Sequence, residues 1–88
     1  MAKYELTFVF DKKDKDLIEV IEKMLDDMKA KDVKKEDWGV RKLAYPVRKL
    51  REAYYLYFEA EINPAKIVKL NQSIKLEERI IRNLIVRN

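Results

Sequence analysis

The chain contains neither cysteine nor histidine, and these two absences exclude most catalytic and metal-binding chemistry. Without cysteine there is no disulfide and no thiolate zinc site. Without histidine, the hydroxyls of Thr7 and Ser73 have no imidazole to activate them. The only glycine, Gly39, leaves no glycine-rich phosphate loop. We therefore expect no catalytic residue, no metal site and no cofactor, and we interpret acidic pairs such as Glu77 and Glu78 as solvated charge.

Long apolar runs are also absent. No stretch approaches the roughly 20 residues of a membrane span, and the N-terminal residues MAKYELTF lack the layout of a signal peptide. We therefore expect a cytoplasmic protein that binds no membrane. The 88 residues leave room for one domain, 1–88, and the content of 48% hydrophobic and 41% charged residues indicates a globular chain.

The charge is unevenly distributed along the chain. The net charge is only +4, but residues 33–51 carry seven lysines or arginines against two acids. Residues 63–88 carry six against two. This asymmetry points to an anionic partner.

The first third of the chain predicts a strand and a helix. Residues 3–10 alternate, which indicates a strand with Tyr4, Leu6, Phe8 and Phe10 toward the core. Residues 14–31 repeat apolar side chains every three or four positions, which predicts an amphipathic helix capped by Asp14. We interpret it as a surface helix on a sheet rather than a partner-binding helix.

The middle of the chain predicts a long hairpin, with strands at residues 33–48 and 52–62 joined by a charged turn at 48–51. Gly39 indicates a bulge or a bend, and Pro46 indicates an edge strand because it has no N–H for the ladder. The second strand alternates, so one face is assigned to the core: Tyr54, Leu56, Phe58, Ala60 and Ile62.

The last part predicts a helix and a strand. Asn63 and Pro64 are typical of a helix start, and helical spacing continues to Ile74 or Lys75. Residues 80–86 read as a last strand with both faces apolar, which leaves its buried face open. The order β-α-β-β-α-β predicts an α+β, ferredoxin-like split β-α-β fold, with a four-stranded antiparallel sheet and two helices on one face. The first hairpin strand and the last strand should form the two edges.

The hairpin residues EDWGVRKLAYPVRKLREAYYLYFEA resemble the bacterial small-subunit ribosomal protein six family. The opening Tyr4-Glu5, the Trp38-Gly39 step and the run Leu43-Ala44-Tyr45-Pro46 carry the likeness, and the C-terminal IIRNLIVR is similar to that family's last strand. The resemblance covers nearly the whole chain. It implies a structural protein of the small ribosomal subunit, not an enzyme, that binds central-domain rRNA jointly with small-subunit ribosomal protein eighteen.

Two departures from the family pattern affect these expectations. The family often has a basic residue directly after the glycine, where this chain has Val40. Many members continue as a polar tail beyond the last strand, whereas this sequence ends at Asn88. We expect any partner contact made by that tail to be missing or shorter.

The basic residues of the hairpin and of the outer strands are the candidate RNA contacts, because phosphate contacts supply affinity and positioning. The alternative is a solvated edge strand that charge protects from aggregation. The candidates are Lys3, Arg41, Lys42, Arg48, Lys49, Arg51, Arg79, Arg82 and Arg87.

The open face of the sheet is the candidate surface for a protein partner, through Tyr55, Tyr57 and Val9. Two alternatives are base stacking by these tyrosines, although the glycine and aromatic signature of RNA-recognition domains is absent, and plain cross-strand packing. Trp38 is interpreted as a packing residue.

Three functional readings remain, of which the ribosomal one is preferred and an enzyme is the least favoured. The alternative is a ferredoxin-like RNA- or protein-binding module outside the ribosome. An enzyme such as a small ferredoxin-like phosphatase would need an anion-binding loop that the sequence lacks. We expect a monomer when free, no small-molecule substrate, and weak RNA binding that strengthens when the protein partner is present.

Overall fold

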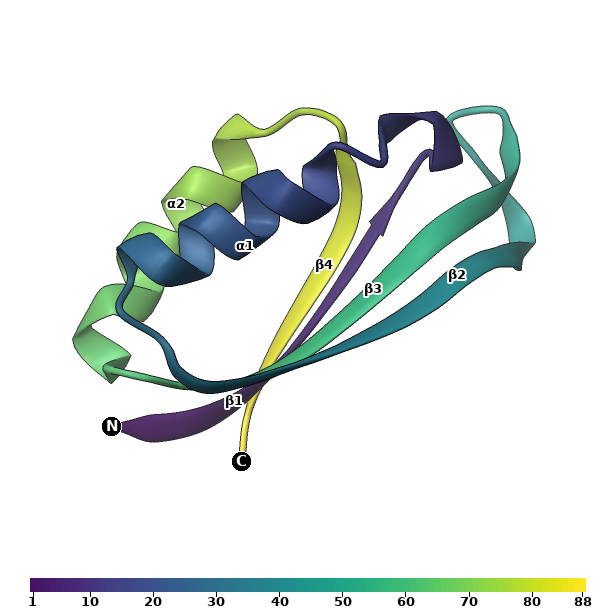
Figure 1. Ribbon diagram of the computed structural model, residues 1–88. Helices are drawn as coiled ribbons and strands as arrows, with labels where there is room; N and C mark the ends of the chain where they lie inside the picture. The colour runs from purple at the N-terminus through teal and green to yellow at the C-terminus, as the bar shows by residue number, and fades with distance from the viewer.

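A computed structural model describes the whole chain, residues 1–88 (Figure 1). The four strands form one antiparallel sheet in the order β2-β3-β1-β4, and both helices lie on one face of it (Figure 1). The predicted ferredoxin-like fold and both edge-strand assignments are therefore confirmed. The elements are β1 (Ala2–Phe10), α1 (Leu17–Asp27), β2 (Lys31–Val47), β3 (Leu50–Ile62), α2 (Ile67–Leu76) and β4 (Ile80–Arg87), with 3₁₀ turns at Lys12–Asp14 and Pro64–Lys66.

The hydrophobic core fills the space between the sheet and the helices. Alternation in β1 and β3 turns one side of each strand toward α1 and α2, and the pairing of Leu6 with Phe58 places these side chains on the same face. Phe8 meets the ring of Phe58 edge to face, with centroids 6.1 Å apart. The predicted core faces of both strands are confirmed. Neither helix has the length and apolar character that crossing a bilayer requires.

The first helix differs from its predicted bounds at both ends. Asp14 does not cap it: Asp14 lies in the 3₁₀ turn, and α1 begins only at Leu17. The helix ends at Asp27 rather than near residue 31, because Lys29 adopts a positive φ of 56° and its N–H returns to the carbonyl of Asp26 at 2.9 Å. No glycine marks the end of α1. The helix predicted from the apolar repeat therefore extended too far toward residue 31.

The predicted start of the second helix is displaced by one turn. Asn63 does accept a hydrogen bond, from the Ala65 N–H at 3.0 Å, but it caps the 3₁₀ turn that precedes α2. For β4 the register decides the face that the sequence left open. Thr7 pairs with Leu84, so Leu84 points to the open side, whereas Ile85 packs against the core.

The β2–β3 hairpin is strongly irregular. Asp37 pairs with Leu56 and Gly39 with Tyr55, so Trp38 is the extra residue of a bulge, as predicted at this glycine. Further along, Lys42 pairs with Glu52 and Val47 with Leu50, so the four residues between Lys42 and Val47 oppose Arg51 alone.

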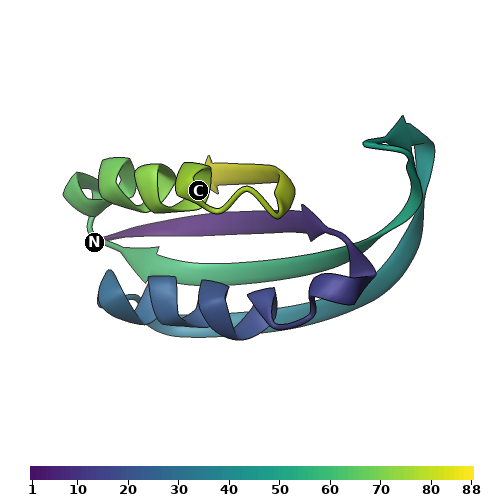
Figure 2. The ribbon, with the colours of Figure 1, turned by 90° about the horizontal axis from the view of Figure 1, so that it is seen from above.

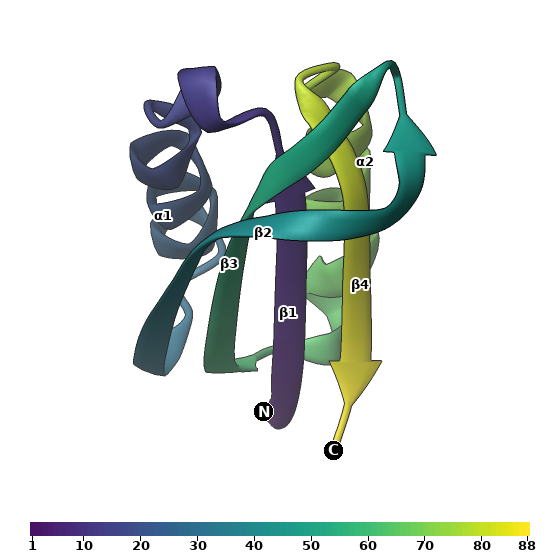
Figure 3. The same cartoon turned by 90° about the vertical axis from the view of Figure 1, so that its right-hand side faces the viewer.

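The turn of the hairpin is tighter than predicted. It is a two-residue turn at Arg48 and Lys49, whose φ angles are 51° and 66°, rather than a loop over 48–51. The end of the hairpin bends away from the sheet edge (Figure 2). It crosses in front of β1 and β4 on the side opposite the helices (Figure 3). We refer to residues 42–51 as the hairpin arm.

Candidate nucleic-acid interface

The hairpin arm covers one end of the otherwise open sheet face. Val9 and Ala53 are buried, with exposures of 7% and 0%, yet they do not belong to the core cluster. Both lie on the face opposite the helices, since Val9 pairs with Tyr55 and Ala53 stands two positions before Tyr55, on the same side of β3. The arm passes over this end of the face (Figure 3). The open face is thus divided into a covered end and a free end.

Two contacts hold the arm on the far side of the sheet. Arg48 donates from Nη1 to the carbonyl oxygen of Glu78 at 2.9 Å, just before β4 begins. Arg82 of β4 donates from Nη2 to the hydroxyl of Tyr45 at 3.3 Å, and its guanidinium carbon lies 5.5 Å from the centroid of that ring. The hydrogen bond and the charge of Arg82 lower the pKa of the Tyr45 phenol below its ordinary value.

The structure separates the candidate RNA-binding residues into three groups. Arg48, Arg79 and Arg82 already make contacts within the chain. Arg41 makes no ion pair or side-chain hydrogen bond, but its guanidinium carbon lies 5.7 Å from the centroid of the Trp38 ring. The remaining candidates make no ion pair and no side-chain hydrogen bond with the rest of the chain: Lys3, Lys42, Lys49, Arg51 and Arg87. Three of these free cations, Lys42, Lys49 and Arg51, lie in the hairpin arm.

Arg79 is the most strongly engaged of the candidates. Its guanidinium binds Glu77 through Nε at 3.0 Å and Asp16 through Nη1 at 2.7 Å, and Asp14 lies 4.0 Å away. These hydrogen bonds raise the pKa of Arg79 and lower that of Glu77. Arg79 therefore ties the start of α1 to the loop before β4, and less of its charge is available to a phosphate.

The candidate partner surface is only partly exposed. Val9 is buried and offers little area, while Tyr55 and Tyr57 are half-buried. The ring of Tyr57 stacks under Trp38 at 5.2 Å, and its hydroxyl contacts the carboxylates of Glu5 and Glu59 at 3.0 and 3.1 Å. Loss of hydration and these two acceptors raise the pKa of Tyr57.

The exposed apolar residues of the open face lie elsewhere. Leu84 and Val86 of β4 are 60% and 41% exposed, and pairing with Thr7 and Glu5 places them on the free end of the face. The sequence did not single out Leu84 and Val86 as candidate partner-surface residues, because both sides of the last strand are apolar. Only the register with β1 shows which side remains uncovered.

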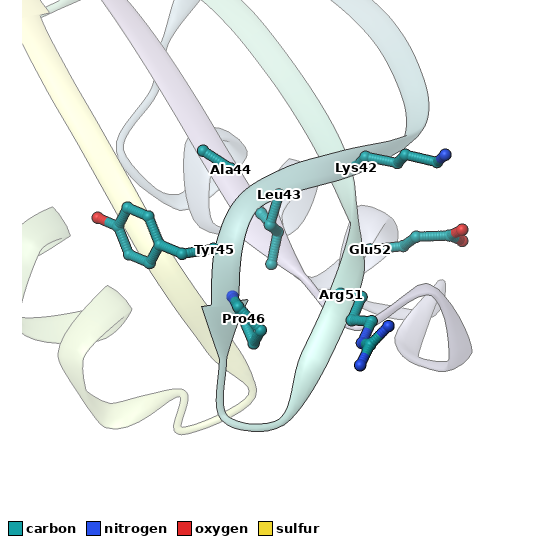
Figure 4. A pocket seen from close by; sticks show the side chains of 7 residues that line it. All are labelled: Lys42, Leu43, Ala44, Tyr45, Pro46, Arg51 and Glu52. Carbon is teal, nitrogen blue, oxygen red and sulfur yellow. The ribbon is translucent and has the colours of Figure 1, made fainter.

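A hollow of about 470 Å³ opens where β2 departs from the ladder. Lys42 and Arg51 supply positive charge, and Tyr45 leaves the arm on the side of β4 (Figure 4). Its one acidic residue, Glu52, is paired with Lys12 at 3.8 Å. The full lining is Lys42, Leu43, Ala44, Tyr45, Pro46, Arg51 and Glu52. Tyr45 was not among the predicted site residues, although its place in a basic segment directly before a proline could have singled it out.

Comparison with known proteins is consistent with this architecture. A family model described as ribosomal protein S6 matches residues 3–87. Small ribosomal subunit protein bS6 of Porphyromonas gingivalis is 35% identical over 92 residues, covering 99% of this chain and 79% of that protein. The bS6 protein of Wigglesworthia glossinidia brevipalpis is 35% identical over 91 residues, covering 99% of this chain and 80% of its own length.

A solved structure shows the same fold. The crystal structure of 30S ribosomal protein S6 from Thermotoga maritima matches with a TM-score of 0.89 and 24% sequence identity, over 99% of this chain and 87% of that one. The family match and the curated relatives confirm the resemblance that the hairpin residues indicate. The chain therefore belongs to the ribosomal protein S6 family.

Proposed function

We propose that this chain is a non-catalytic, structural component of the small ribosomal subunit in the cytoplasm, where it binds central-domain rRNA. The main support for RNA contact is the charge of the hairpin arm. Residues 42–51 hold four basic side chains and no acidic one. Of these, Lys42, Lys49 and Arg51 have no partner within the chain, so their charge is available to phosphates.

We propose further that the chain binds rRNA together with small-subunit ribosomal protein eighteen. A net charge of +4 neutralises few phosphates, so the chain alone should hold RNA weakly. The free end of the open face, with Leu84 and Val86 exposed, offers apolar area for a protein partner. Binding of the partner and of RNA is then linked, and each strengthens the other. The free chain is a monomer in this proposal.

The test is a titration of a central-domain rRNA fragment with the chain, alone and with protein eighteen. We expect much tighter binding in the presence of the partner. Equal affinity in both titrations would refute the cooperative arrangement. Equal affinity for unrelated RNA would instead favour the alternative, a general RNA-binding module outside the ribosome.

The charge contribution is tested by the double variant Arg41→Ala/Lys42→Ala. It should weaken binding and reduce the slope of log affinity against log salt by roughly one unit for each lost phosphate contact. The matched control is Lys66→Ala/Lys69→Ala, which removes the same charge around the start of α2. A slope that changes equally in both variants, or in neither, would show that Arg41 and Lys42 only solubilise the sheet edge.

A further inference from the structure

Most aromatic rings of the chain are unavailable to a ligand. Five lie in the core: Tyr4, Phe8, Phe10, Tyr54 and Phe58. Tyr55 and Tyr57 are half-buried, and Trp38, 41% exposed, is stacked on Tyr57. Tyr45 is the exception, because 61% of it is exposed. It is the most accessible aromatic side chain of the molecule.

The Tyr45 ring is exposed but held in place. Arg82 bonds its hydroxyl at 3.3 Å and lies 5.5 Å from the ring centroid, so one side of the ring is occupied by a cation from β4. The arm that carries the ring is itself fixed by the bond from Arg48 to the Glu78 carbonyl. A ring positioned in this way loses little conformational freedom when a flat ligand stacks on it.

The charge around Tyr45 selects the kind of ligand. The arm contributes Lys42, Lys49 and Arg51 without acidic partners, and the nearby Glu52 is paired with Lys12 at 3.8 Å. Lys42 and Arg51 line the hollow of about 470 Å³ in the same segment of the arm (Figure 4). Figure 4 shows the Tyr45 ring on the β4 side of the arm and the side chains of Lys42 and Arg51 on the other side. An anionic strand that crosses the arm, with one flat group on the ring and its charges over these cations, fits this arrangement. A nucleotide within an RNA strand has this form, since its base stacks and its neighbouring phosphates are anionic.

We propose that Tyr45 is a stacking platform for one unpaired base of the bound RNA, whose flanking phosphates contact the free cations of the hairpin arm. The inference rests on the proposed function and extends it, because it names an unpaired nucleotide rather than duplex phosphates as the ligand of the arm. Arg82 acts as a positioning residue that holds the ring. The sequence suggested Tyr55 and Tyr57 as residues for base stacking. In this proposal Tyr45 of the hairpin arm has that role instead.

Ultraviolet crosslinking of the full chain to the central-domain rRNA fragment, with protein eighteen present, tests this directly. Trypsin cleaves after Lys42 and Arg48, so Tyr45 is released in the peptide 43–48, whereas Trp38 lies in 36–41 and Tyr55 with Tyr57 in 52–66. We expect the nucleotide adduct on peptide 43–48. An adduct confined to 36–41 or 52–66 would overturn the proposal.

Two substitutions separate stacking from packing. Tyr45→Phe keeps the ring but loses the hydrogen bond from Arg82, so it should bind RNA more weakly than the natural chain and more tightly than Tyr45→Leu. Tyr45→Leu keeps apolar volume but removes the π face, and it should weaken RNA binding between about fivefold and about a hundredfold without changing the salt slope. Thermal unfolding should be nearly unchanged in both variants because the residue is exposed.

The outcomes distinguish this inference from the proposed function. If the natural chain fails to bind the fragment with and without protein eighteen, the proposed function itself fails. If it binds but Tyr45→Leu binds equally well, only the stacking platform fails. If Tyr45→Leu weakens association with protein eighteen in the absence of RNA, Tyr45 belongs to the protein interface and the proposal is overturned.

Discussion

Replacing Asp37 by alanine should destabilise the protein through two hydrogen bonds that one carboxylate accepts. Its Oδ1 accepts from the Gly39 N–H at 3.0 Å, and its Oδ2 accepts from the hydroxyl of Tyr54. The first bond closes the bulge in β2, where Gly39 has a φ of 71°. The second joins the bulge to a core residue of β3 that is only 6% exposed. Asp37 is therefore the contact between the irregular edge strand and the core.

The size of the effect follows from burial. A hydrogen bond to a charged group contributes about 1.5–3 kcal/mol, but Asp37 is itself exposed, so water will replace part of each bond. We expect the free energy of unfolding to fall by about 2 kcal/mol in Asp37→Ala. For a domain of this size, that corresponds to a fall in the melting temperature of about 8–16 °C. Asp37→Asn keeps one acceptor and should cost about half as much.

The assay is urea unfolding of Asp37→Ala, Tyr54→Phe and the double variant, monitored by the fluorescence of Trp38 in the adjoining bulge. The two changes should be coupled by about 1 kcal/mol, because each removes one partner of the same bond. A coupling energy near zero would refute the role of the Tyr54 bond. A loss below about 0.5 kcal/mol in Asp37→Ala would refute the role of both bonds, since that is the range of neutral surface changes.

Two further outcomes concern charge. The hydrogen bond to Asp37 and burial raise the pKa of Tyr54 from 10.0 to about 12. The folded state thus retains the phenolic proton longer than the unfolded state, so stability present below pH 10 is lost as the pH rises toward 12, by at most about 1.4 kcal/mol per pH unit. Urea midpoints measured from pH 9 to pH 11 should fall less in Tyr54→Phe, and parallel curves would contradict this. Arg79→Ala breaks the contacts to Asp16 and Glu77 of a 39% exposed side chain, so the urea midpoint should fall slightly at low salt and less at high salt, where the exposed charges are screened. Lys13→Ala, which loses only a 4.0 Å pair at a 77% exposed side chain, is the control and should show no change.

Local patterns were sufficient for the elements that form the core. In β1, and in β3 from Tyr54 onward, every second residue is apolar, and an alternation with period two leaves only one way to bury a strand. The order of strands and helices then selected the ferredoxin-like topology, because right-handed crossovers leave few other arrangements. Gly39 also predicted the bulge in β2, and Pro46 predicted its edge position, since each residue type has its own effect on the backbone of a strand.

The helix ends were less predictable. The positive φ of Lys29 ends α1 without a glycine, so no residue type marked the stop. The same holds for the turn at Arg48 and Lys49, where two basic residues take the left-handed conformation that usually favours glycine or asparagine. Both conformations depend on the packing of the elements that they join.

The sequence by itself determined the fold class, the family and the presence of a basic hairpin, because these follow from periodicity, composition and a specific run of residues. Only the tertiary structure decided which cations are free. Arg48, Arg79 and Arg82 find partners from distant segments, and no local pattern reports such contacts. The tertiary structure also decided that Val9 is covered while Leu84 and Tyr45 are exposed. Burial depends on where the arm crosses the sheet, and that path results from contacts between residues more than 25 positions apart in the chain.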